Sequence, residues 1–156
     1  MYPRRLLFVL IFVASCVPLA AARDLALVAN KSNTVNAMTV PDLARFCKGE
    51  VNRWPDGKPV TFVMRAPSVP EMRIVLEKIY GMSESEVTGL IVTANHGRGN
   101  HPAIIIATSD EDLINRVASL PGAIGLVDVY SINSSVAVIK IAGKGPFEPG
   151  YLLHGN

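Results

Sequence analysis

Cysteine and aromatic residues are scarce in this chain. Only two of its 156 residues are cysteine, Cys16 and Cys47, and only one is tryptophan. Because Cys16 falls in a segment that we expect to be removed or lipid-modified, Cys47 is the only thiol left to the folded protein, which excludes an intramolecular disulfide. No cationic pocket is evident around Cys47, so we expect a small buried hydrophobic residue rather than a redox centre.

A hydrophobic run long enough for a membrane span is also missing, since a span needs about 20 residues. The run at 6–17 is shorter; it follows Arg4 and Arg5 and precedes small residues at 20–22. This pattern predicts an export signal in residues 1–22 and a soluble, exported, periplasmic domain in residues 23–156. An alternative stays open, because residues 13–16 also fit a lipoprotein signal that would anchor the protein through Cys16.

The chain has no strong charge of either sign. It carries 15 basic and 13 acidic residues, and Arg4 and Arg5 account for the basic excess. The predicted mature chain is therefore neutral, which argues against nucleic acid and anionic membranes as partners. Its length is typical of a single domain.

Catalytic and metal-binding motifs are absent as well. There is no Gly-x-Ser-x-Gly elbow, and the histidines have no serine or cysteine partner at a recognisable spacing. His96 and His101 flank a glycine-containing loop without a third ligand, which makes a poor zinc site. Residues 143–146 are interpreted as a turn. We expect neither an enzyme nor a cofactor or metal.

What the chain does have is a repeated signal for helix starts. A hydroxyl residue is followed three positions later by a carboxylate, the pattern of a capping box. The pairs are Thr39 with Asp42, Ser68 with Glu71, Ser83 with Glu86, and Ser109 with Asp112. Apolar residues recur at helical spacing after each pair, which predicts a helix there.

Short, nearly continuous apolar stretches lie between these helices, as is typical of strands covered on both faces. The stretches are 25–29, 60–64, 103–107, 123–127 and 136–141. The order of elements predicts an α/β fold, with a mostly parallel sheet and helices on both faces. Gly122 and Gly125, at the start of the fourth stretch, indicate a close approach of backbone to its neighbours.

Two segments, 43–60 with its Arg-Trp-Pro-Asp-Gly turn and 121–127, carry a resemblance to a known family. Together with the strand and turn at 25–33 and the Gly-Met-Ser at 81–83, they resemble the phosphate-type periplasmic substrate-binding proteins. The resemblance implies a type 2 periplasmic-binding-protein fold and a role in ABC-type phosphate uptake. Members of that family have two lobes that close on an oxyanion, and this chain has the length of about one lobe.

The resemblance also implies a position for the ligand. Arg65 matches the family's arginine, but Val69, Pro70 and Glu71 stand where the family has Ser-Gly-Thr at the start of a helix. Pro70 lacks an amide donor, and Glu71 places a carboxylate where an anion would bind. Two interpretations stay open: an oxyanion site, or a helix capped by Ser68 and Glu71 beside a structural Arg65.

Ligands of open α/β sheets collect at the carboxyl ends of the strands. We expect that edge to carry Asn30, Lys31, Ser32, Arg65, Ser68, Thr108 and Ser109. The predicted ligand-binding residues are Arg65, Ser68, Ser32, Thr108, Ser109 and, from the glycine-rich loop, Arg98.

Two hypotheses about function follow. The first is an exported solute-binding-protein-like module that binds phosphate or another oxyanion. The alternative is an envelope module that kept the fold, lost the anion site and binds another protein or a second copy of itself. A homodimer would place two Arg65 side chains face to face, which requires an anion between them.

Overall fold

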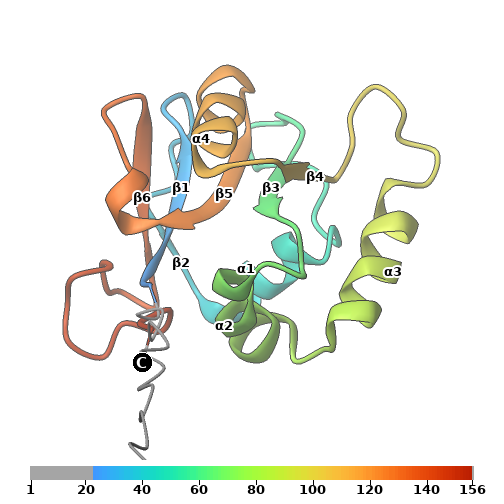
Figure 1. The fold of residues 1–156 in the computed structure, drawn as a ribbon. Helices are drawn as coiled ribbons and strands as arrows, with labels where there is room; N and C mark the ends of the chain where they lie inside the picture. The colour runs from blue at the N-terminus through green and yellow to red at the C-terminus, as the bar shows by residue number, and fades with distance from the viewer. Residues whose placement is uncertain (1–22, 156) are drawn as a thin grey trace, which may run out of the picture.

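The computed structural model describes residues 23–155, which form a six-stranded sheet with helices on both faces (Figure 1). The expected export signal and the alternative anchor at Cys16 lie outside these residues. The strands are β1 Leu25–Asn30, β2 Ala37–Met38, β3 Thr61–Arg65, β4 Ile104–Ala107, β5 Ala123–Asp128 and β6 Val136–Ile141. Their order across the sheet is β2-β6-β1-β5-β3-β4.

Strand direction decides which loops share an edge of the sheet. β3 runs parallel to β4 and β5, and β2 runs parallel to β6, so the predicted mostly parallel sheet is confirmed. β1, in contrast, is antiparallel to both β5 and β6. We call the end of the sheet where β3, β4 and β5 finish the carboxyl edge, and the end where they begin the amino edge. Because β1 is reversed, it finishes at the amino edge.

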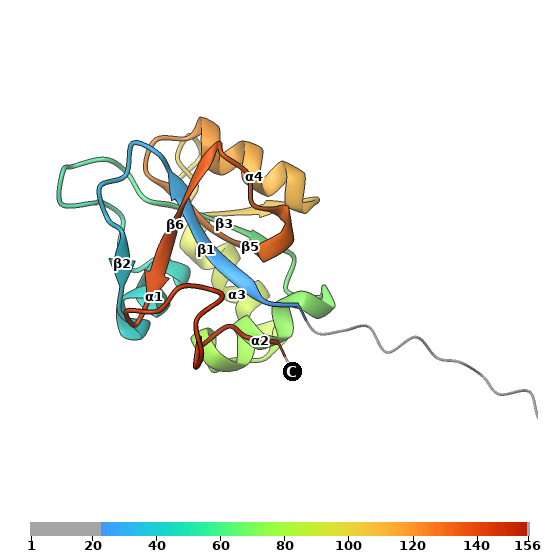
Figure 2. The same ribbon diagram turned by 90° about the vertical axis from the view of Figure 1, so that its left-hand side faces the viewer.

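The helices divide between the two faces of the sheet, as predicted (Figures 1 and 2). α4, Asp110–Ser119, covers one face. The other face is covered by α1, Val40–Cys47, by α3, Glu84–Asn95, and by the segment around α2, Arg73–Val75. That segment opens with the 3-10 turn η1, Pro70–Met72, and closes with the π-helical turn η2, Leu76–Tyr80. A further 3-10 turn, η3, spans Val129–Ser131.

Alternate residues of the central strands supply two cores. On β1, Leu25, Leu27 and Ala29 pack in the larger core under α1 and the α2 segment, while Val28 packs in the smaller core under α4. This alternation is the two-residue period of a strand. Every residue of β1 and β5 is buried, so the expectation that continuous apolar stretches are covered on both faces is confirmed for these two strands. It is wrong for β6, where three of the six residues are exposed, and for β4, where Ile106 is exposed.

Cys47 lies at the end of α1 and is a free, fully buried cysteine. The hydroxyl of Tyr80 donates a hydrogen bond of 2.8 Å to the backbone carbonyl of Cys47, which joins η2 to α1. Burial raises the pKa of the Cys47 thiol, so the reactive thiolate is disfavoured. The prediction of a structural rather than reactive cysteine agrees with this environment.

The helix-start signals have mixed outcomes. Ser83 and Glu86 form a complete capping box, and Thr39 and Ser109 each accept a backbone hydrogen bond as predicted. The expected box of Ser68 and Glu71 is wrong, because Val69 is the cap residue of η1 and no side chain caps it. The reason is Pro70: a proline favours the first helical position, and it holds the residue before it in an extended conformation.

The chain's last segment packs on its own domain. Tyr151 and Leu153 are buried in the larger core, and the amide of Leu25 donates 3.1 Å to the carbonyl of Leu153. The amide of Gly155 donates 2.8 Å to the carboxylate of Asp24. The tail is therefore fixed beside the start of β1 (Figure 2).

The smaller core depends on a glycine in β5. A Cβ atom on Gly125 would lie 2.8 Å from the carbonyl oxygen of Val63 and 2.9 Å from the nearest methyl carbon of Leu113. Such distances are shorter than van der Waals contact, so α4 can approach the sheet only because this side chain is missing. The close approach predicted at Gly125 is confirmed.

Substitution of Gly125 by alanine should therefore destabilise the protein. We expect a loss of about 1–3 kcal/mol in the free energy of unfolding, because α4 must move away from a well-packed face. Urea denaturation followed by circular dichroism measures this loss.

Gly89→Ala is the matched control, since Gly89 is exposed in α3 and a Cβ there meets nothing within 4 Å. That change should stabilise α3 by roughly 0.5–1 kcal/mol through helix propensity. Equal stability of the two variants would contradict the assigned contact between α4 and β5.

Candidate functional site

The carboxyl edge brings Arg65, Thr108 and Ser109 together, as expected. Arg65 ends β3 directly beside Ala107 of β4, and Thr108 and Ser109 follow β4 into α4. The guanidinium Nη1 of Arg65 lies 3.0 Å from the carboxylate of Asp110, and both side chains are about a quarter exposed, at 24% and 26%. The other oxygen of Asp110 accepts a hydrogen bond of 3.1 Å from the hydroxyl of Ser131.

A second ion pair lies at the same edge. Arg23 donates 2.8 Å to Asp128, whose side chain is only 2% exposed. Asp128 also accepts the amide of Tyr130. The pKa of Arg23 is raised, first by its hydrogen bond and charge interaction with Asp128 and further by the charges of Glu71 and Asp110.

The start of α4 is occupied by its own side chains. The amide and hydroxyl of Thr108 both donate to the carboxylate of Asp112, and the hydroxyl of Ser109 accepts the amide of Asp112. The pKa of Asp112 is lowered, mainly by the hydrogen bond from the Thr108 amide and also by Arg116. With Glu111, this first turn presents carboxylates where a helix start would otherwise attract an anion.

The carboxyl edge is therefore richer in carboxylates than in cations. Among the described residues its cations are Arg23, Arg65 and Arg116, which pairs with Asp112 at 2.8 Å, and its carboxylates are Glu71, Asp110, Glu111, Asp112 and Asp128. The Nε atom of Arg65 is buried and has no hydrogen-bond partner within residues 23–155. Arg65 is thus held in place by one carboxylate while part of its hydrogen-bonding capacity stays unused.

Ser32 does not share this edge, contrary to expectation, and neither do Asn30 and Lys31. They follow β1, which is antiparallel to β5 and so finishes at the amino edge. There the amide nitrogen of Asn30 donates to the carbonyls of Val117 and Ala118 near the end of α4. The hydroxyl of Ser32 donates 2.7 Å to Asn30. The prediction assumed that β1 was parallel to its neighbours.

Arg98 and Ser68 have different positions. Arg98 lies in the loop that precedes β4, so it is at the amino edge, at the opposite end of the strands from Arg65. With Gly97, Gly99, Asn100 and His101 it lines a shallow polar hollow. Ser68 lies on the turn between β3 and η1, on the side of the carboxyl edge, and it is exposed. Of the predicted ligand-binding residues, Arg65, Ser68, Thr108 and Ser109 therefore belong to one edge.

Sequence reasoning missed Asp110, Ser131, Arg23 and Asp128 as members of this edge. Asp110 could have been found, because it is the first residue of α4 and the neighbouring parallel strand ends in Arg65. Arg23 and Asp128 meet only because β1 and β5 pair with Leu25 opposite Asp128. No local pattern encodes that register.

Two turns meet at the amino edge. The indole nitrogen of Trp54 donates 2.8 Å to the carbonyl of Gly122, and its side chain is nearly buried. Gly122 has a φ of +84°, and a Cβ there would lie 2.1 Å from the carbonyl oxygen of Pro59. The close approach predicted at Gly122 is therefore confirmed, and it joins the two sequence segments that carried the family resemblance.

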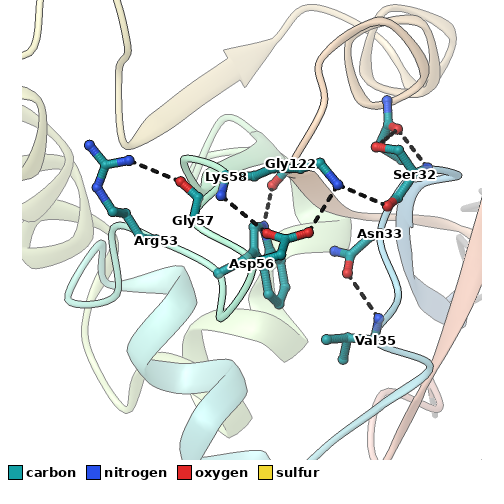
Figure 3. A network of polar contacts seen from close by, with 10 residues as sticks. Ser32, Asn33, Val35, Arg53, Asp56, Gly57, Lys58 and Gly122 are labelled. Atoms are coloured by element: carbon teal, nitrogen blue, oxygen red, sulfur yellow. Dashed lines mark hydrogen bonds and ion pairs between the residues drawn. The ribbon is translucent and has the colours of Figure 1, made fainter.

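Polar contacts at the surface of this junction join the turn after Trp54 to the loop after β1. Figure 3 shows Lys58 between the carboxylate of Asp56 and the carbonyl of Ser32, at 2.9 and 3.3 Å. The hydrogen bonds from Lys58 lower the pKa of Asp56. Arg53 donates 2.9 Å to the carbonyl of Gly57 across the same turn.

Trp54→Phe should test the junction. The ring is kept in part, but the donor to the buried Gly122 carbonyl is lost, so we expect the free energy of unfolding to fall by about 1–2 kcal/mol. Because Trp54 is the only tryptophan, circular dichroism rather than fluorescence should follow the transition.

The control for this change is Arg53→Ala, since Arg53 bonds only an exposed carbonyl of the same turn. It should alter stability by less than about 0.5 kcal/mol. A Trp54→Phe protein as stable as the Arg53→Ala protein would show that the indole hydrogen bond is dispensable.

Comparison with known proteins identifies the fold. No family model and no curated protein matches the sequence. Among solved structures, a phosphate ABC transporter substrate-binding protein from Clostridium perfringens, crystallised with bound phosphate, matches at a TM-score of 0.62 and 21% identity, over 81% of this chain and 48% of the other. An ABC-type phosphate transport receptor from Vibrio cholerae matches at 0.55 and 20%, over 81% and 49%.

The chain has the fold of one lobe of a phosphate-type periplasmic binding protein. A phosphate-binding protein from Stenotrophomonas maltophilia matches in the same way, at a TM-score of 0.62 and 16% identity, over 81% of this chain and 41% of that one. This chain thus matches half or less of the length of each of these proteins. All three are described as binding or transport proteins.

Within residues 23–155, no helix has both the length and the apolar character needed to cross a membrane. In the same part of the chain, no three histidine, cysteine or acidic side chains gather closely enough to hold a metal ion.

Proposed function

We propose that this protein is an exported, periplasmic solute-binding-protein-like module of an ABC-type uptake system, and that it binds phosphate or a similar oxyanion at the carboxyl edge. The observation that carries the proposal is Arg65. It stands at the end of β3, at the edge where ligands of α/β sheets collect, in a fold that phosphate-binding proteins share. Its guanidinium is planar and offers several donors to an oxyanion.

Asp110 is then an internal competitor for the ligand. It holds the guanidinium of Arg65 in position, which reduces the ordering cost of binding, but its charge repels an anion. The unpartnered Nε of Arg65 favours a ligand, since a buried donor without an acceptor costs free energy. The exposed hydroxyl of Ser68 provides a further donor on the same side. We therefore expect weak binding that depends on the state of Asp110.

Calorimetric titration with phosphate at low ionic strength tests this proposal, since screening is weakest there. The wild-type protein should show saturable binding that Arg65→Ala abolishes. Asp110→Asn keeps the size of the side chain and removes its charge, so it should tighten binding about fivefold, equivalent to roughly 1 kcal/mol for a partly exposed charge.

Arg98→Ala is the control variant, because it removes a cation at the opposite edge of the sheet and should leave the affinity unchanged. If no heat of binding is seen into the millimolar range in either the wild type or Asp110→Asn, the oxyanion function is wrong.

Three observations favour the second function, a module that binds protein instead of an anion. Carboxylates outnumber cations at the carboxyl edge, and Arg65 already has an ionic partner. Tyr130 is 87% exposed beside Ser131, as an aromatic anchor of a protein interface would be in the free state.

Sedimentation with and without phosphate separates the two functions. A dimer that forms through Arg65 only with phosphate supports the first, and phosphate-independent association lost in Tyr130→Ser supports the second.

Export is a separate part of the proposal. Cleavage before Arg23 should give a periplasmic product whose intact mass corresponds to residues 23–156, and Cys16→Ala should leave both the mass and the location unchanged. Mass spectrometry of the fractionated protein measures this. A lipid-modified Cys16 at the new N-terminus would instead establish the anchored form.

A further inference from the structure

A hollow on the surface shares no lining residue with the carboxyl edge and has a different chemistry. It has a volume of about 410 Å³, within the size range of ligand sites. Its lining comes from β2 with the residue two before it, the exposed side of α1, the Trp-Pro turn and the loop after β6: Val35, Ala37, Met38, Thr39, Asp42, Phe46, Trp54, Pro55, Ala142 and Gly143. We call it the β2 groove.

Aromatic rings and one carboxylate give the β2 groove its character. The rings of Phe46 and Trp54 pack with their centres 4.6 Å apart, and the rest of the lining is mostly apolar. Asp42 is the single charged residue of the lining, and its side chain is 50% exposed. One oxygen of Asp42 accepts a hydrogen bond of 2.8 Å from the hydroxyl of Thr39, and the other forms a long ion pair of 3.9 Å with Arg45, which solvent screens because both side chains are exposed. An occupant that matches this surface has an apolar group next to a positive charge.

The sheet provides an open strand edge beside the groove. β2 is the outermost strand, with β6 on one side and no described strand on the other (Figure 2). The carbonyls of Asn36 and Met38 accept hydrogen bonds from Lys140 and Ala142, so both point toward β6. Because successive backbone groups of a strand alternate in direction, the amide and carbonyl of Ala37 face outward.

These observations favour a peptide over a small molecule. This edge is short: β2 has two residues, neither of them charged or proline, and it offers a partner strand the outward backbone groups of Ala37. An added strand would bond the outward backbone groups of Ala37 and place alternate side chains over the groove. Its residues i and i+2 would then reach the Phe46 and Trp54 rings and the carboxylate of Asp42.

We propose that the β2 groove binds an extended peptide segment by strand addition to β2, with an apolar side chain over Phe46 and Trp54 and a basic side chain two residues away at Asp42. The occupant is a protein segment of this pattern. The site is separate from Arg65 and does not depend on whether the carboxyl edge binds an anion.

The probe is the acetylated and amidated pentapeptide Thr-Phe-Thr-Lys-Thr, titrated into the purified protein. Trp54 lines the groove and is the only tryptophan, so its fluorescence reports on the site. We expect a saturable change with a Kd below about 1 mM. Replacing the peptide's lysine by glutamate should weaken binding about fivefold, and added phosphate should have no effect.

Backbone pairing has its own test. Neighbouring amides of a strand point in opposite directions, so of two peptides N-methylated at adjacent residues only one should lose binding, by about tenfold or more. Equal binding of both methylated peptides would overturn strand addition, because the groove would then be recognising side chains alone. Loss of binding in both methylated peptides would overturn strand addition as well, because only one of two neighbouring amides of an added strand faces β2 and can donate a hydrogen bond to it.

Two variants of the protein complete the experiment. Asp42→Asn should remove the preference for lysine over glutamate while Glu84→Gln, an exposed carboxylate on α3, should keep it. The peptide comparison retains its force even if Asp42→Asn perturbs α1, since it uses the unaltered protein. No binding up to several millimolar, or equal affinity for the lysine and glutamate peptides, would overturn the proposal.

Discussion

The hydrogen bond from Trp54 to the carbonyl of Gly122 joins two turns that are 68 residues apart in the chain. It fixes where β3 and β5 begin, and these strands pair from their first residues, Thr61 with Ala123. The contact requires a glycine, because at position 122 a Cβ would collide with the Pro59 carbonyl. From this point the two strands run side by side to the carboxyl edge, so the placement of Arg65 and Asp128 there depends on a junction at the opposite end of the sheet.

Much of the fold could be predicted from local patterns. The apolar stretches located five of the strands to within one residue, and the glycines at 122 and 125 indicated the tight contacts. β2 was missed because a pair of residues with only one buried side chain carries no periodicity. The direction of β1 could not be predicted, since apolar content is the same whichever way a strand runs.

That single direction explains most of what was wrong about the site. Ser32 was expected beside Arg65 and instead bonds Asn30 near the end of α4, because a parallel β1 had been assumed. The pairing of Arg23 with Asp128 depends on the register of β1 and β5, which local sequence does not encode. Ser68 is a different case: its failure as a cap follows from Pro70, a residue whose conformational effect is readable from the sequence.

At the carboxyl edge, the chain itself supplies the ionic partner of Arg65. A guanidinium left alone in a partly buried position is costly, and Asp110, backed by Ser131, supplies an anion from the chain itself. The same carboxylate stabilises the fold and weakens the binding of any external anion to Arg65. If the edge binds an anion as proposed, a change at Asp110 that raises the affinity will lower the stability of the fold.

The two ends of the described chain lie next to each other, because Asp24 and Leu25 bond Gly155 and Leu153. A polypeptide that enters this domain at residue 23 leaves it at nearly the same point. Such a domain can be placed within a surface loop of a host protein without stretching the host backbone, as the proximity of termini permits for inserted domains generally. The hydrogen bonds that hold the tail beside the start of β1 thus also make this lobe suitable for insertion into another protein.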